Sequence, residues 1–341
     1  MRNTEIIVRA DGDYETGMMH ISRGIAICQM VKELAPVFFA TQFPGPFISK
    51  LIPETISALT FPAEDYEDAF LEYVKERLEE KQVILVLEGY EFYEPFQQTF
   101  REAGAKIVLI HNRLYPHHQC DVLINTDCGI TLDSYNSPTK ADLYSGDDYA
   151  LIRPLFMEAA KKKAAPTRDP RKVFICFGST DLYDKTLSML QVMTKLPQFE
   201  ELTVLSSSLY RNVELLEFCR DRNDPRIRLY LDADEATLFN LISQAELCIT
   251  SAGTLALEVM AVGKPLMCTT THYEQKPSYS WYTETGLCYG FEDYWKYLHT
   301  SFYFKFLENP ELRETMVRRQ KLYLDGLSGE RICGILKALM D

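Results

Sequence analysis

Short runs of apolar and β-branched residues alternate along this chain with longer stretches in which apolar residues recur every three or four positions. The first pattern is typical of buried strands and the second of amphipathic helices. Their alternation predicts parallel strands joined by crossover helices, which defines an α/β fold. In the first half, the strand candidates are residues 5–11, 36–43, 58–62, 83–89, 106–112 and 121–127, and the helix candidates are residues 20–34, 45–52, 65–81 and 93–103.

The same pattern restarts after a basic, Ala-rich segment that is interrupted by proline, at residues 157–171. We therefore expect a Rossmann-like domain over residues 1–157, a linker at 158–171 and a second Rossmann-like domain over residues 172–341, facing each other across a cleft. The second domain is expected to end in an aromatic-rich helical tail. Its strand candidates are residues 172–178, 202–207, 226–232, 247–253 and 265–271, and its helix candidates are residues 184–195, 210–221, 235–245, 254–262 and 275–286.

Composition and charge exclude several classes of protein. The chain has 341 residues, 46% of them hydrophobic and 25% charged, so it can bury substantial cores and does not belong to the disordered or fibrous classes. A formal charge of -13 gives no overall attraction for nucleic acid or an anionic bilayer. No stretch approaches the roughly 18 apolar residues of a membrane span. We expect a cytoplasmic protein whose nine scattered cysteines are free thiols.

The first candidate for chemistry is the loop between residues 9 and 23, which leads from a strand into a helix. Gly17 favours a tight turn, and His20 falls at the start of the helix, where the dipole disfavours a positive imidazole. A neutral His20 can act as a base. Asp11 could fix its tautomer, and Arg23, one turn later, could pair with a phosphate oxygen. The alternative is a helix-capping histidine with an incidental arginine.

Two segments of the second half resemble diphosphate loops, because each follows a strand and precedes a helix. In the first of them a simple turn is an equally good interpretation. In the second, a carboxylate one turn into the helix could accept hydrogen bonds from two ribose hydroxyls. The candidates are Gly178, Ser179, Thr180 and Asp181 in the first segment, Ser251, Gly253, Thr254 and Glu258 in the second, and Glu274 and Gln275 farther along the chain.

Several motifs occur together and in a fixed order. They are R-x-D…G-x-x-H-x-x-R from Arg9 to Arg23, Cys120-Asp121 with LIN at 123–125, YALIRP with Arg153 and a following Phe156, FG…D at 177–181, SAG…E at 251–258 and Glu274-Gln275. In this combination the sequence resembles the UDP-sugar hydrolases of pseudaminic acid biosynthesis, whose C-terminal half is similar to GT-B glycosyltransferases of the MurG kind. Met19 stands where the family has glycine, and Asn112 and Arg113 replace a pair of aspartates.

The resemblance implies a GT-B-like fold and a hydrolase that cleaves a UDP-linked amino or deoxy sugar at its anomeric carbon. Its substrate would be of the UDP-2,4-diacetamido-2,4,6-trideoxy-hexose type. His20, Asp11 and Arg23 would be catalytic, and Arg9, Gly17 and Arg153 would join the loop residues in binding the substrate. No cofactor or metal is expected. A GT-B glycosyltransferase and a non-catalytic nucleotide-sugar binding protein stay open as alternatives, as does the oligomeric state.

Overall fold

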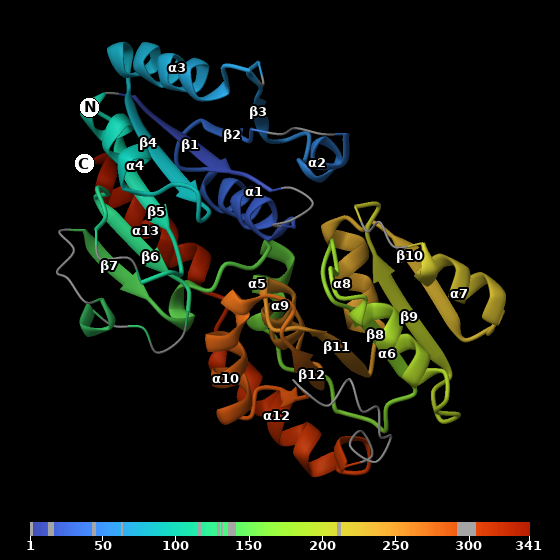
Figure 1. The fold of residues 1–341 in the computed structure, drawn as a ribbon. Coiled ribbons are helices and arrows are strands. Elements are labelled where there is room, and N and C mark those ends of the chain that lie inside the picture. The colour runs from blue at the N-terminus through green and yellow to red at the C-terminus, as the bar shows by residue number, and fades with distance from the viewer. Residues whose placement is uncertain are drawn as a thin grey trace. The chain divides into compact units, whose positions relative to one another are not determined.

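The chain forms two compact units in the computed structural model (Figure 1). Unit 1 comprises Met1–Pro154 and Leu327–Asp341, and unit 2 comprises Leu155–Gly326. The structure describes residues 3–12, 17–42, 46–62, 64–114, 117–127, 130, 132–135, 141–209, 213–291 and 305–341. Cys128 and most of the aromatic-rich tail, residues 292–304, lie outside these ranges.

Unit 1 is built on a parallel sheet of seven strands in the order β3-β2-β1-β4-β5-β6-β7. Because β1 and β4 are neighbours, the winding direction reverses between them, and ligands of such sheets bind at the carboxyl ends beside this switch point. The register pairs Ala10 with Glu88 there. The strands are β1 (Thr4–Ala10), β2 (Val37–Ala40), β3 (Ser57–Leu59), β4 (Gln82–Glu88), β5 (Lys106–Ile110), β6 (Val122–Asn125) and β7 (Asp142–Ser145).

Helices cover this sheet because its strands are apolar on both faces. β4 illustrates this, since its residues from Val83 to Leu87 are all buried. On one side, Phe70 and Val74 of α3 and Phe100 of α4 pack against strand residues in one core cluster. The helices are α1 (Met19–Val31), α2 (Pro46–Leu51), α3 (Tyr66–Glu80), α4 (Glu94–Glu102) and α13 (Ser328–Met340).

Unit 2 repeats the design on a parallel sheet of six strands in the order β10-β9-β8-β11-β12-β13, with its switch point between β8 and β11. The strands are β8 (Lys172–Cys176), β9 (Glu201–Ser206), β10 (Ile227–Leu231), β11 (Leu247–Ser251), β12 (Leu266–Thr269) and β13 (Tyr289–Gly290). The helices are α5 (Pro154–Ala160), α6 (Lys185–Met193), α7 (Glu214–Arg222), α8 (Glu235–Gln244), α9 (Thr254–Val262), α10 (Lys276–Glu284) and α12 (Pro310–Tyr323).

Local sequence explains where several of these helices begin and end. The Asp234 side chain accepts a hydrogen bond from the Thr237 amide at the start of α8, and Asn309 caps α12 in the same way. α9 ends at Gly263, whose φ of 80° is the left-handed conformation that stops a helix at low cost.

The observed units differ from the expected domain boundaries at both ends of the second half. α5, which the expected boundary divides, lies in unit 2, because Phe156 packs edge-on against Phe239 and the Leu155 amide donates to Glu235. α13 returns to unit 1, where the red helix lies among blue and green elements in Figure 1. There Gln82 donates to the carbonyl of Leu339, and the buried face of α13 carries Ile332, Ile335 and Leu336.

Every strand and helix candidate overlaps an observed element, and the α/β fold class of two doubly wound units is confirmed. β7 and β13 were not predicted. β7 is an edge strand of mixed polarity, and β13 has only two residues. Among the described helices, none is long and apolar enough to cross a bilayer. The cysteines at described positions are free.

Candidate functional site

His20 lies at the switch point of unit 1, in contact with an acidic residue that the sequence analysis did not single out. The ring sits in the first turn of α1, and its Nδ1 is 2.7 Å from Oε1 of Glu88, the last residue of β4. Both residues are almost fully buried. An ionised carboxylate only accepts hydrogen bonds, so Nδ1 carries the proton and Nε2 keeps its lone pair. This is the tautomer that a general base needs at Nε2.

Arg23 completes this group, but not in the predicted role. Its Nε forms an ion pair with Oε1 of Glu88 at 3.2 Å, and its Nη2 donates to the Thr126 hydroxyl at 3.2 Å. The side chain is 6% exposed. A guanidinium paired and buried in this way balances the charge of Glu88, and these contacts give no support to the expected pairing with a phosphate.

Asp11 and Arg9 form a separate structural pair, which contradicts their expected roles. Arg9 binds Asp11 at 2.7 Å and Glu67 at 3.0 Å, and its guanidinium lies 4.3 Å from the ring centroid of Tyr66. Arg9 is buried, and its guanidinium is held by these two carboxylates. Asp11 also accepts from the backbone amide of Gln42 at 2.6 Å, so it ties β1 to the loop after β2. The partner that orients His20 is Glu88 instead of Asp11.

Other polar and aromatic side chains of unit 1 gather at the same carboxyl ends. The ring of Tyr90 packs edge-on against His20, with 4.8 Å between centroids, and against His111. Burial lowers the pKa of His111 to about 4, so its ring is neutral at pH 7. His118 is buried beside His111. Gly17, two residues before α1, has a φ of 74°, which fits the predicted tight turn.

In unit 2, the first diphosphate segment is arranged differently from the prediction. Asp181 accepts hydrogen bonds from the backbone amides of Lys185 at 3.0 Å and Thr186 at 2.7 Å, in the first turn of α6. Burial raises the pKa of its carboxyl group. Asp181 therefore caps the helix, and its carboxylate occupies these two amides of the first turn. Gly178 is exposed with a φ of 113°, Ser179 is half-buried and Thr180 is buried.

Lys185 is a buried cation of the same region that the sequence analysis missed. Its Nζ lies 3.5 Å from the Thr269 hydroxyl and donates to the carbonyl oxygen of Thr270, where β12 ends. No sequence signal distinguished Lys185 from the exposed lysines, because a side chain reaches a neighbouring strand end only in three dimensions.

In the second segment, Gln275 lies beside Gly253. Gly253 precedes α9, and a Cβ built there would lie 3.3 Å from Nε2 of Gln275. The Oε1 atom of Gln275 accepts from the Thr271 amide at 2.8 Å, which fixes the side chain beside Gly253. Glu258, one turn into α9, is 1% exposed.

The remaining candidates have the following positions. Ser251 is buried at the end of β11, Thr254 begins α9 and is half-buried, and Glu274 is half-buried in the short 3-10 helix Tyr273–Gln275. Arg153 is half-buried in the residue before α5.

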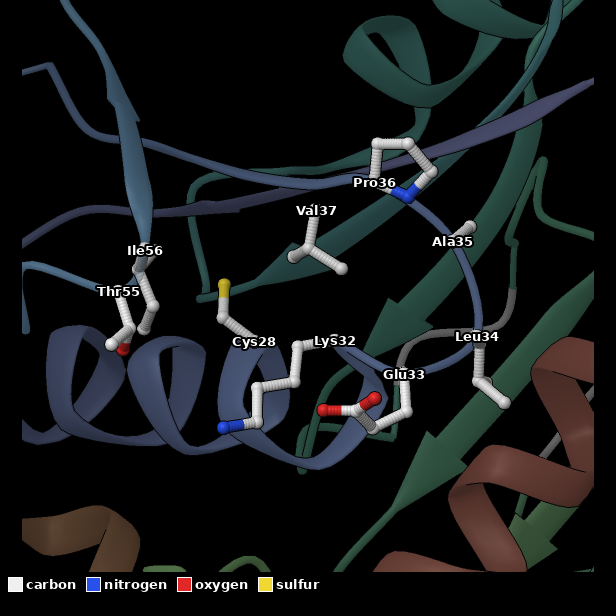
Figure 2. Close-up of a pocket in the computed structure, with 9 residues that line it drawn as sticks. All are labelled: Cys28, Lys32, Glu33, Leu34, Ala35, Pro36, Val37, Thr55 and Ile56. Atoms are coloured by element: carbon white, nitrogen blue, oxygen red, sulfur yellow. The ribbon is translucent and has the colours of Figure 1, made fainter.

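A cavity of about 370 Å³ in unit 1 lies at the opposite end of the sheet from His20. Figure 2 shows its lining, in which Cys28 and Lys32 come from the end of α1, and Pro36 and Val37 from the start of β2. Since these residues are at the amino ends of the strands, the cavity does not belong to the His20 site.

Comparisons with known proteins support the resemblance inferred from the motifs. No protein-family model matches the chain. The chain is 26% identical, over 286 residues, to the UDP-2,4-diacetamido-2,4,6-trideoxy-beta-L-altropyranose hydrolase of Campylobacter jejuni, with 83% of this chain and 97% of the hydrolase covered. It is 22% identical, over 264 residues, to the spore coat polysaccharide biosynthesis protein SpsG of Bacillus subtilis, with 76% and 75% covered.

The predicted resemblance is confirmed. Among solved structures, MurG of Acinetobacter baumannii matches with a TM-score of 0.64 and 13% identity over 98% of this chain and 99% of that one. The UDP-GlcNAc 2-epimerase of Neisseria meningitidis, solved with UDP-GlcNAc bound, matches with a TM-score of 0.64 and 12% identity over 98% and 100%. At such identities these likenesses show the fold, which is that of MurG-like GT-B proteins.

Proposed function

We propose that this protein hydrolyses a UDP-linked amino or deoxy sugar at the anomeric carbon and releases UDP and the free sugar. The observation that carries the proposal is the His20–Glu88 pair at the switch point of unit 1. The likeness to the Campylobacter jejuni hydrolase, which covers nearly all of that enzyme, supports it. A UDP-diacetamido-trideoxy-hexose is the first substrate to try, and the expected cytoplasmic location remains a prediction.

In the proposed mechanism, His20 acts as the general base. With Nδ1 held by Glu88, Nε2 accepts a proton from water as the water oxygen bonds to the anomeric carbon. The bond from that carbon to the diphosphate oxygen breaks, and UDP leaves with the electron pair. General-base catalysis of this kind contributes about 10² to 10⁴ in rate. Arg23 balances the charge of the buried Glu88 carboxylate that holds Nδ1.

We place the nucleotide in unit 2, beside the switch point between β8 and β11. There Gly253 and Thr254 present backbone at the start of α9, where the helix dipole favours a phosphate. Gln275 borders the same backbone, and Glu258 is assigned to the ribose hydroxyls. Ser251, Gly178, Ser179, Thr180 and Glu274 complete the proposed lining. Asp181, Arg9 and Asp11 are left out, since their contacts give them structural roles.

A glycosyltransferase is the second candidate, because the solved structures with this fold include a glycosyltransferase from Rickettsia africae at a TM-score of 0.64. The two reactions share a donor and differ in the nucleophile. The test incubates the protein with a panel of UDP-amino sugars in ¹⁸O-labelled water, with and without sugar acceptors.

Hydrolysis predicts UDP release without acceptor, with the label in the free sugar and not in UDP. Release of UDP only with acceptor would establish transfer. Label in UDP would show that the phosphorus–oxygen bond is cleaved instead of the bond to the anomeric carbon. Thermal stabilisation by UDP-sugars without any release would indicate a binding protein. The matched control for His20→Asn is His117→Asn, since His117 is an exposed histidine of the same unit.

A further inference from the structure

Glu91 lies in the loop between β4 and α4, three residues after Glu88, and its side chain folds back over the end of β4. Gly89 has a φ of 153°, and a Cβ built there would collide with both carboxylate oxygens of Glu91. The glycine thus provides the space that the carboxylate occupies. Glu91 as a residue is exposed, whereas Glu88 is 1% exposed. This places the carboxylate of an exposed residue against the carboxyl end of β4, where His20 also lies.

Two of the described carboxylates near His20 are paired with arginines. Asp11 is paired with Arg9 at 2.7 Å, and Glu88 is paired with Arg23 at 3.2 Å. Glu91 forms no ion pair with a lysine or arginine of the described residues. The opposite charges of each ion pair largely cancel at a distance. The negative charge that acts on His20 from the loop after β4 therefore comes from Glu91.

The titratable groups that face Glu91 belong to three elements: His20 of α1, Asp11 after β1 and Glu88 of β4. Burial of its carboxyl group and repulsion from Asp11 and Glu88 raise the pKa of Glu91, although its own backbone amide and His20 favour the charged form. The fold thus keeps a carboxyl group whose charged form it disfavours, at some cost in stability, which is common among groups kept for function.

We propose that Glu91 is an electrostatic positioning residue, whose negative charge stabilises the imidazolium that His20 becomes as it deprotonates the nucleophile. The inference rests on the proposed function. In the step concerned, the O–H bond of water breaks and its proton bonds to Nε2 of His20. The oxygen bonds to the anomeric carbon, and UDP leaves. A positive charge therefore develops on His20 at the moment when a nearby negative charge is most effective.

The test compares Glu91→Gln, Glu91→Asp and the control Glu102→Gln, an exposed glutamate at the far end of α4. Glu91→Gln is expected to lower turnover about three- to tenfold and to move the acidic limb of the rate profile about one unit lower, since imidazolium forms less easily without the charge. Glu91→Asp is expected to restore part of the rate, and Glu102→Gln to change neither quantity.

Melting temperature supplies a second readout, because the proposed electrostatic role and a structural role predict changes of opposite sign in Glu91→Gln. Because the pKa of Glu91 is raised in the fold, its charged form destabilises the native state, and protonation relieves this as the pH falls. Glu91→Gln should therefore melt higher than the wild type at pH 7. The difference should close as the pH falls through the raised pKa and vanish below the ordinary value of 4.5. A lower melting temperature with unchanged turnover per folded molecule would overturn the proposal.

NMR titration of the His20 ring, without substrate, separates this inference from the proposed function. A shift to lower pH in Glu91→Gln, in a protein that hydrolyses no UDP-sugar, would support the electrostatic coupling and refute the hydrolase. Normal hydrolysis with no shift in either the NMR titration or the rate profile would refute the coupling and leave the hydrolase standing.

Discussion

Replacing Glu88 by glutamine tests whether the buried pair with Arg23 maintains the site. The amide keeps the size of the side chain and an oxygen that can accept from Nδ1 of His20, but it has no charge. Arg23 would then be a buried cation without a counter-charge, since its other contact is the Thr126 hydroxyl. We expect lower stability and lower turnover for separate reasons.

The stability effect follows from the separation of the charges. At an effective dielectric constant of about 20, unit charges 3.2 Å apart attract by about 5 kcal/mol. Removing one partner of a buried pair costs about 3–5 kcal/mol. Because glutamine keeps an acceptor oxygen, we expect a cost near the lower end of this range. For a unit of this size, 1 kcal/mol corresponds to about 2–4 °C, so the melting temperature should fall by roughly 10 °C. Turnover should fall about 10- to 100-fold, because the unbalanced Arg23 opposes protonation of His20.

Thermal denaturation and UDP release, measured on the same preparation, check both numbers. The control is Glu67→Gln, which removes a carboxylate with 48% exposure from the buried Arg9 and should cost less than about 1 kcal/mol. The double variant Glu88→Gln/Arg23→Met should regain stability without regaining turnover. If Glu88→Gln melted like Glu67→Gln and turned over normally, the importance assigned to the buried pair would be wrong.

Two further substitutions test the structural roles that replaced predicted binding roles. Asp181→Ala should lower the stability of the fold by about 0.5–2 kcal/mol through loss of the α6 cap. UDP affinity, measured by calorimetry, should be unchanged. Weaker UDP binding without loss of stability would show that Asp181 is a ligand after all. Arg9→Met should cost about 3–5 kcal/mol by leaving Asp11 without its cation, as measured by urea denaturation. An equally stable Arg9→Met protein that no longer binds UDP-sugar would make Arg9 a substrate residue.

The sequence predicted the order of the elements well, because alternation of buried strands and amphipathic helices is a local pattern. It also located the loops that follow β1, β8 and β11, since glycine and small polar residues mark a strand-to-helix turn. The convergence of Gly253 and Gln275 could be expected for the same reason: both follow neighbouring strands, β11 and β12, at the same edge of the sheet.

Partners that come from distant segments could not be predicted in this way. Glu88 is 68 positions from His20, and only the pairing of β1 with β4 brings them together. Its place at the end of an apolar strand was the available signal. Asp181 was ambiguous, because an acidic residue after a glycine turn serves equally well as a helix cap or as a ligand. Arg9 was misjudged because an arginine buried against Tyr66 has the same sequence signature as one that faces a substrate.

Assignment of His20 as the base depends on one comparison, which is single-turnover UDP release without acceptor by the wild type, His20→Asn and His117→Asn. Asparagine can still donate to Glu88 but cannot accept a proton at pH 7. The expected result is a fall of about 10² or more in the rate for His20→Asn, with UDP affinity nearly unchanged and His117→Asn as fast as the wild type. A folded His20→Asn protein that releases UDP at the wild-type rate would contradict the mechanism.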